Sequence, residues 1–145
     1  MGIAPKFSAA DVHKMVEAKM QGVTAQIEAK LIRVGNKFVA DARQKADFTD
    51  RTGNLRSSIG FIVLKDGKQI AADFEKSVKG TDKVTGEVTG VGLANQIGNK
   101  FNKGYTLVVV AGMEYAAAVE SKGRDVLTGS SIQAVANLSQ YFKRK

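Results

Sequence analysis

The sequence predicts an α+β fold, with a long N-terminal helix and a C-terminal helix packed on a small, mainly antiparallel β-sheet. Three observations predict it. Apolar residues recur at helical spacing over residues 8–46 and again over 128–143. Two runs rich in β-branched and apolar residues, at 59–64 and 105–111, have the composition of strands. A chain of 145 residues has the size of one ordinary domain, so residues 1–145 are expected to form a single domain.

The first helix is predicted over residues 8–46. Ser8 is a suitable N-cap, and Asp11 lies where it complements the free amides of the first turn. Such a helix would extend roughly 55–60 Å, more than the width of a small domain. One end should therefore project or bend, with Gly22 and Gly35 as its weak points. Its apolar stripe, expected to serve the core and in part a neighbouring subunit, comprises Val12, Val16, Met20, Val23, Ile27, Leu31, Val34 and Phe38.

A corner and a hairpin are predicted over residues 52–74. Gly53 can adopt the positive φ that a sharp turn requires. Leu55 and Ile59 follow four residues apart, a spacing that directs both toward the core across one helical turn. Residues 59–64 then form a strand with two apolar faces, Phe61 and Val63 on one and Ile62 and Leu64 on the other. The Asp-Gly pair at 66–67 predicts a tight turn into a second strand at 69–74.

Residues 75–104 are predicted to form a flexible loop. Six glycines and five lysines interrupt this segment, and neither helical nor strand periodicity is sustained in it. At most, residues 93–97 would make a short helical turn. We expect the segment to be mobile in the free subunit and to become ordered on a partner.

The C-terminal part is predicted as a strand, a packed segment and a helix. Residues 105–111 are apolar on both faces, which predicts a central strand. Residues 113–120 fit either a strand or a short helix, and Gly123 ends them. The last helix spans 128–143, and the basic residues 143–145 suit the negative end of its dipole. Its apolar stripe consists of Ile132, Val135, Leu138 and Phe142.

The formal charge of +8 makes nucleic acid a candidate partner. The excess is spread along the chain, however, at +3 over residues 1–48, +3 over 49–104 and +2 over 105–145. Evenly mixed charge is more typical of a solvated surface, and few aromatic residues are present for stacking on bases. A non-specific nucleic-acid-binding module is therefore the alternative to the function proposed below.

No residue pattern indicates catalysis. His13 is the only histidine and there is no cysteine, so no catalytic residues, cofactor-binding residues or metal ligands are predicted. The serines have no adjacent base to activate them. A third class, a small enzyme, thus lacks a credible site, and we expect neither enzymatic activity nor a cofactor. No apolar run approaches the ~20 residues of a membrane span, so no membrane association is expected.

Two motifs resemble the signature of a known family. The corner reads Thr52-Gly53-Asn54-Leu55-Arg56-Ser57-Ser58-Ile59, and a later segment reads Tyr115-Ala116-Ala117-Ala118-Val119-Glu120-Ser121-Lys122-Gly123. Together they are similar to the Thr-Gly-X-Leu-Arg-X-Ser-Ile and Tyr-Ala-X-X-Val-Glu-X-Gly patterns of the neck proteins of long-tailed bacteriophages. These are head–tail connector, or tail-completion, proteins. The order of the elements agrees with that family along nearly the whole chain. The motif residues carried over are Thr52, Gly53, Leu55, Arg56, Ile59, Tyr115, Val119, Glu120 and Gly123.

The resemblance implies a structural protein of the virion, made in the host cytoplasm and located in the neck or tail region. It implies a homo-oligomeric ring, six-fold as a first expectation, that joins head to tail or completes the upper end of the tail. The implied partners are other neck and tail proteins, and DNA that passes through the lumen without sequence-specific binding.

Arg56 and Glu120 lie in the two motifs, and both motifs should pack on the same sheet. The guanidinium fork can clamp a carboxylate in two hydrogen bonds. We therefore expect these two side chains to form an ion pair that joins the corner to the 115–120 segment, with two unrelated surface charges as the alternative.

Overall fold

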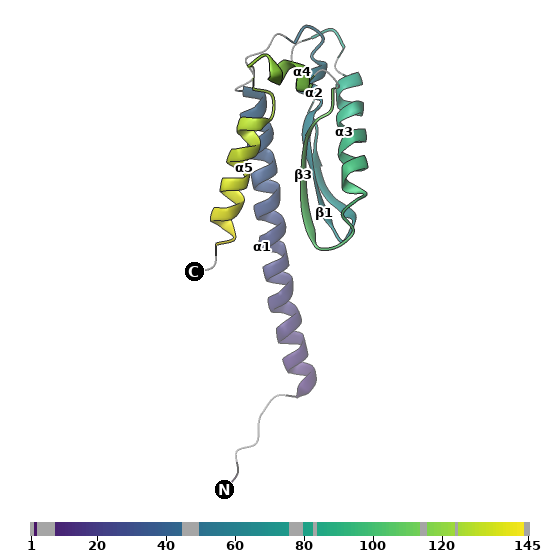
Figure 1. Cartoon of the computed structure of the whole chain (residues 1–145). Helices are drawn as coiled ribbons and strands as arrows, with labels where there is room; N and C mark the ends of the chain where they lie inside the picture. The colour runs from purple at the N-terminus through teal and green to yellow at the C-terminus, as the bar shows by residue number, and fades with distance from the viewer. Residues whose placement is uncertain are drawn as a thin grey trace.

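The structure is a computed structural model that describes residues 2, 8–44, 50–75, 80–82, 84–113, 116–123 and 125–143. A long helix and a shorter one lie on one side of a three-stranded antiparallel sheet, and a third helix lies on the other side (Figure 1). The predicted α+β class is confirmed. The elements are α1 (Ala9–Gln44), α2 (Asn54–Ser57), β1 (Ile59–Lys65), β2 (Lys68–Asp73), α3 (Val84–Gly98), β3 (Tyr105–Ala111), α4 (Ala116–Ser121) and α5 (Thr128–Tyr141).

The strand order is β2-β1-β3, so β1 is the central strand. Strand β3 was predicted to be central and is an edge strand, so that prediction is wrong. Helices cover both faces of the sheet, so an edge strand such as β3 is also covered on both faces. Two apolar faces therefore do not show that a strand is central. The Asp66-Gly67 turn joins β1 to β2 as predicted, and the β1–β2 register shifts between Val63 and Leu64.

The two faces of β1 belong to two separate core clusters. Phe61 and Val63 lie in the cluster formed with α1, α4 and α5. Ile62 and Leu64 lie in the other cluster, with Ala94 of α3 and with Val108 and Val110 of β3. This is the assignment of faces that the alternation in the sequence predicts. Full burial of each such side chain contributes about 1.5–3 kcal/mol of transfer free energy.

Helix α3 occupies Val84–Gly98, inside the segment predicted to be a flexible loop, and that prediction is wrong for these residues. Residues 76–79 and 83 of the same segment lie outside the described residues. The buried positions of α3 recur every four residues, which is one face of a helix. They are all small: Gly86, Gly90, Ala94 and Gly98.

These small residues let α3 approach the backbone of the corner. A Cβ added to Gly90 would lie 2.5 Å from the carbonyl oxygen of Ser58, and one added to Gly86 would meet the carbonyl oxygen of Asn54. A Cβ on Gly98 would press on the Leu64 and Ile62 side chains at 3.0 and 3.1 Å. The glycines that interrupt the periodicity of the sequence are therefore the packed face of the helix.

Helix α1 is a single element of 36 residues, about 54 Å long at ~1.5 Å per residue. As predicted, Ser8 caps it: the Ser8 hydroxyl accepts a hydrogen bond from the Asp11 amide at 3.2 Å. Its C-terminal half supplies Leu31, Val34, Phe38 and Val39 to the core. Residues 9–23 are exposed throughout, and in Figure 1 they extend beyond the sheet. Gly35, predicted as a weak point, is buried against the Phe61 ring.

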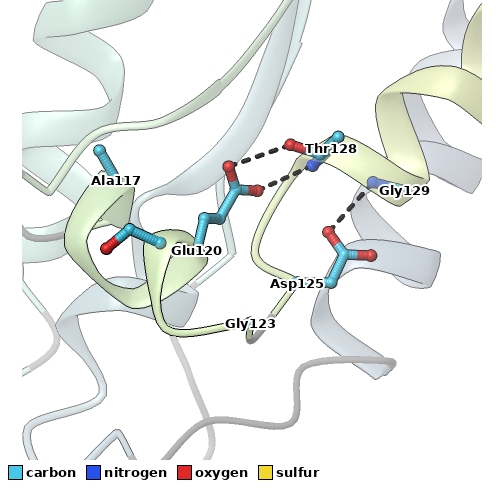
Figure 2. A pocket seen from close by; sticks show the side chains of 7 residues that line it. Ala117, Glu120, Gly123, Asp125, Thr128 and Gly129 are labelled. Atoms are coloured by element: carbon cyan, nitrogen blue, oxygen red, sulfur yellow. Dashed lines mark hydrogen bonds between the residues drawn. The ribbon is translucent and has the colours of Figure 1, made fainter.

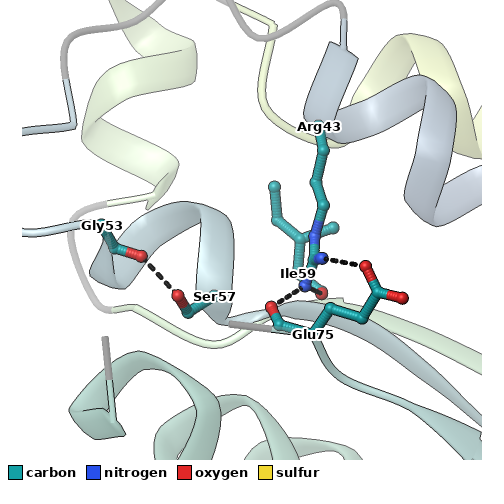
Figure 3. Close-up of polar contacts among 5 residues, drawn as sticks. All are labelled: Arg43, Gly53, Ser57, Ile59 and Glu75. Carbon is teal, nitrogen blue, oxygen red and sulfur yellow. Dashed lines mark hydrogen bonds and ion pairs between the residues drawn. The ribbon is translucent and has the colours of Figure 1, made fainter. Parts of the chain in front are cut away.

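Side chains fix α1 to the sheet at two levels. Near the end of the helix, the Arg43 guanidinium donates to the carbonyl oxygens of Ile59 and Glu75 and pairs with the Glu75 carboxylate (Figure 3). Burial lowers the pKa of Arg43, and the nearby carboxylates of Glu75 and Asp73 oppose that shift. Midway along the helix, the Glu28 carboxylate accepts a hydrogen bond from the Tyr105 hydroxyl at 3.0 Å. The part of α1 that precedes Glu28 extends away from the body of the domain (Figure 1).

Helix α5 packs on α1 through a face that differs from its apolar stripe. Its inward residues are Ser130, Ala134, Leu138 and Tyr141, whereas Ile132, Val135 and Phe142 of the predicted stripe are exposed. Only Leu138 of that stripe is partly buried, so most of the apolar stripe does not face the core. Small inward residues allow the two helices to approach closely.

We predict opposite stability changes for two Gly→Ala substitutions in the interior of α3. Gly90→Ala should destabilise the protein by about 1–3 kcal/mol, because its methyl group collides with the Ser58 carbonyl. Gly92→Ala is the matched control, since no described residue lies within 4 Å of its added Cβ. It should stabilise the protein by about 0.5–1 kcal/mol through helix propensity. Urea unfolding measures both, and equal effects of the two changes would contradict this packing.

Candidate assembly interface

The Thr-Gly corner is built by local hydrogen bonds. Gly53 has φ 79°, the left-handed conformation expected for it. The Asp50 carboxylate accepts hydrogen bonds from the amides of Gly53 at 3.0 Å and Arg56 at 2.8 Å. The Thr52 hydroxyl accepts one from the Asn54 amide at 3.2 Å, and the Ser57 hydroxyl donates to the Gly53 carbonyl (Figure 3). This motif thus forms a tightly bonded turn at the entrance to β1.

The corner is also the point at which α3 attaches. The Asn54 side-chain oxygen accepts a hydrogen bond from the Gly86 amide at 2.9 Å, in the first turn of α3. Leu55 and Ile59 are almost fully buried in the core cluster on the α1 side, as their spacing predicts. Arg56 is half-buried. The role of Asn54 was missed in the sequence, because its partner lies 32 residues away.

The second motif forms α4 and the turn after it. Tyr115 lies outside the described residues. Val119 is partly buried and packs on the same core cluster as Leu55 and Ile59, so the two motifs do share one core. Gly123 has φ 81° and ends the segment, as predicted.

Glu120 caps the N-terminus of α5 (Figure 2). One carboxylate oxygen accepts hydrogen bonds from the amides of Leu127 at 2.7 Å and Thr128 at 2.8 Å, and the other accepts one from the Thr128 hydroxyl at 3.0 Å. Burial by itself raises the pKa of Glu120, but these hydrogen bonds outweigh it, so the pKa lies below its ordinary value of 4.5. Asp125 adds a bond from the Gly129 amide at 3.0 Å.

The predicted ion pair between Arg56 and Glu120 is wrong. The ion pairs recorded among the described residues are His13–Glu17, Arg43–Glu75 and Lys65–Glu28. Both oxygens of Glu120 are directed to the amides and the hydroxyl of α5 instead. A helix N-terminus carries a partial positive charge, which satisfies the carboxylate without a cation.

The projecting half of α1 carries a continuous exposed apolar surface, which we call the α1 stripe. Met15 and Met20 are 71% and 64% exposed, and a shallow groove lies along Val12, Met15, Val16 and Lys19. Met15 was not part of the predicted stripe and widens it. Exposed apolar strips of this kind mark contact surfaces. The members of the α1 stripe are Val12, Met15, Val16, Met20 and Val23.

Lysines gather at the turn end of the sheet. The Asp66 carboxylate accepts a hydrogen bond from the Gly104 amide at 2.8 Å, which holds the β1–β2 turn against the loop before β3. Phe101 in that loop is exposed. This arrangement, which we call the lysine tip, brings together residues far apart in the sequence: Lys65, Lys68, Lys100 and Lys103.

The described residues contain neither a metal-binding cluster nor a membrane-spanning helix. In that part of the chain, no group of three or more His, Cys, Asp or Glu side chains is placed to hold a metal ion. The same residues contain no helix with the length and apolar character that crossing a membrane requires.

We predict that Glu120→Gln destabilises the protein at neutral pH by about 0.5–2 kcal/mol, the usual loss for a helix cap. Because the folded state lowers the pKa of Glu120, the charged form stabilises the fold above pH 4.5. That contribution disappears as the pH falls through the folded-state pKa. Urea unfolding at pH 7 and pH 3 should therefore show a difference between wild type and variant that shrinks in acid. Glu17→Gln, on the projecting half of α1, is the control, and a pH-independent difference would contradict the assignment.

The chain was compared with known protein families, with curated proteins and with solved structures, and none of the three comparisons found a match.

Proposed function

We propose that this chain is a structural subunit of the neck of a tailed phage, which joins head and tail or completes the upper end of the tail by assembling into a ring. The observation that carries the proposal is the α1 stripe, an exposed apolar surface on a helix that extends past its own domain. A monomer has no use for such a surface, whereas a repeating assembly does. The function is binding and assembly without turnover.

The two sequence motifs support the same proposal. They resemble the neck family, and in the structure they form the turn that starts β1 and the cap that starts α5. Both structures fix helices relative to the sheet, so the motifs hold the subunit's shape and the interface lies elsewhere. A ring of such subunits leaves a central passage for DNA, and its neighbours along the axis would be other neck and tail proteins. Six-fold symmetry, matching the tail, is our proposal for the ring.

We predict that deletion of the gene for this chain, in the phage that encodes it, yields DNA-filled heads and separate tails in place of infectious particles. Electron microscopy of lysates measures the joined fraction. Expression of the wild-type chain from a plasmid should restore joining, and a chain with Met20→Lys in the α1 stripe should not. Normal particles after deletion would reject the neck role.

The lysine tip favours a second candidate, non-specific binding of nucleic acid. Three of its four lysines, all except Lys65, are exposed, and Phe101, in the same loop as Lys100 and Lys103, is exposed as well. Such a surface would contact phosphates and stack on a base. This candidate is compatible with a ring through which DNA passes. It differs from the first because it requires the free subunit itself to bind nucleic acid with measurable affinity.

If the second candidate holds, the logarithm of the affinity for random duplex DNA should fall linearly with the logarithm of the salt concentration. The double change Lys100→Gln and Lys103→Gln should then reduce the slope by about 0.9 for each phosphate that the variant no longer neutralises. The control double change Lys14→Gln and Lys37→Gln, on α1, should leave the slope unchanged. Fluorescence anisotropy provides the measurement, and equal slopes for the two double variants would exclude the lysine tip as the binding surface.

A further inference from the structure

We infer that the α1 stripe of one copy docks on the outward side of helix α5 in the next copy. This inference rests on the proposed assembly role and names the two surfaces that meet. The second surface, which we call the α5 outer face, includes Ile132 and Val135 of the apolar stripe and lies exposed in the structure. Its residues are Thr128, Ile132, Val135, Ala136 and Ser139.

The distribution of side chains around α5 points to a partner. Ile132 and Val135 are 65% and 64% exposed, while the face packed on α1 carries the small residues Ser130 and Ala134. A helix that served only its own domain would place its large apolar residues inward. Here only Leu138 and Tyr141 face inward while Ile132 and Val135 stay exposed, so burial of the latter two requires a second surface.

Helix α5 also lacks charge. Its 14 residues, Thr128–Tyr141, contain no Asp, Glu, Lys or Arg, in a chain in which a quarter of the residues are charged. Depletion of charge is what distinguishes the buried centre of an interface from the rest of a protein surface. The exposed residues of the outer face are therefore suited to contact with protein and poorly suited to permanent contact with water.

The α1 stripe matches this face in length and chemistry. Residues 9–23 and α5 each extend about 21 Å at ~1.5 Å per residue. The stripe lies on one side of α1. In the C-terminal half of the helix, the same side packs on the domain's own core through Leu31 and Val34. Asp11 and Glu17 border the stripe on its two sides, and Lys19 lines the groove within it, so both signs of charge are present. An uncharged helix can approach this mixed border without repulsion.

A second copy of the chain is the occupant because each copy carries both surfaces. In Figure 1, α5 lies beside the half of α1 nearer its C-terminal end, so a copy cannot place its own α5 on its projecting half. Contact between two α1 stripes would leave both α5 outer faces uncovered. Contact between a stripe and an outer face covers both kinds of surface with one repeated interaction. Such a contact is heterologous, and it closes a ring or extends a filament.

The contact is small, which determines how it must be tested. Two helices meeting over ~21 Å bury much less than the ~800 Å² per partner of a stable interface. Free subunits should therefore associate weakly, and the contact should be trapped covalently. The chain has no cysteine, so single cysteines can be introduced without background.

The experiment mixes two single-cysteine chains of the full length, Val16→Cys in the α1 stripe and Ile132→Cys in the α5 outer face, with only one of them tagged. Mild oxidation of the mixture should give a disulfide-linked heterodimer roughly tenfold faster than either chain alone gives a homodimer. Ala18→Cys is exposed on the opposite side of α1 and is the matched control. Its mixture with Ile132→Cys should react at the slow rate. Adding Met20→Lys to the Val16→Cys chain should reduce the fast rate to that of the control.

Three results would overturn the inference. Fast homodimer formation by the Val16→Cys chain alone would show that the α1 stripes of two copies contact each other. Equal rates in all mixtures would show that no such contact exists. Flotation of the wild-type chain with phosphatidylglycerol–phosphatidylcholine vesicles, abolished by Met20→Lys and without heterodimer formation, would assign the stripe to a lipid surface.

The trap and the deletion experiment fail independently. A fast heterodimer together with normal particles after deletion would keep the contact and reject the neck role. Separate heads and tails after deletion, without a heterodimer, would keep the role and reject this contact.

Discussion

The burial of β1 on both faces is the constraint on which the rest of the structure depends. Ile59, Phe61, Ile62 and Val63 are all at most 1% exposed, so the sheet needs a helix on each side. A three-stranded sheet is too narrow to bury its central strand by itself. Helix α1 covers one face and α3 the other, and the corner at Gly53 must bring α3 to the same end of the sheet at which α1 finishes. The Asp50 and Asn54 hydrogen bonds and the Arg43 clamp all lie at that end.

The glycines of α3 show why one layer of the fold could not be predicted. Glycine is normally a helix breaker, and a segment with six of them has the composition of a loop. Read at intervals of four, however, Gly86, Gly90, Ala94 and Gly98 form one packed face, which meets the backbone of the corner at Gly86 and Gly90 and the β1 side chains at Gly98. The cost in helix propensity is offset by close packing, because a side chain at position 86 or 90 would collide with the backbone of the corner. Whether this segment is a loop or a helix depends on the position of the surface it packs on, which residues far away in the sequence determine.

The other features of the fold were predicted where they depend on nearby residues and missed where they depend on distant ones. The Ser8 cap, the Asp66-Gly67 turn, the alternation of β1 and the Gly53 conformation depend on neighbours within a few residues, and all were predicted. The edge position of β3, the inward face of α5 and the partner of Glu120 depend on elements elsewhere in the chain, and all were missed. For the candidate interface, the stripe was predicted from helical periodicity, and its projection from the length of the helix. The α5 outer face was hidden, because an apolar helical stripe looks the same whether it meets the core or another molecule.

The attachment of α1 has a mechanical consequence. The helix is fixed by Glu28 and Arg43 and continues without interruption to Ala9, so its free part is a lever arm of about 28 Å beyond the Glu28 support. Any tilt imposed on the distal end would be carried along an intact hydrogen-bonded rod to the opposite end of the domain. There it would act on Ile59 and Glu75 through the Arg43 guanidinium. A load at one tip of the molecule would thus be transmitted to the turn that orients the central strand.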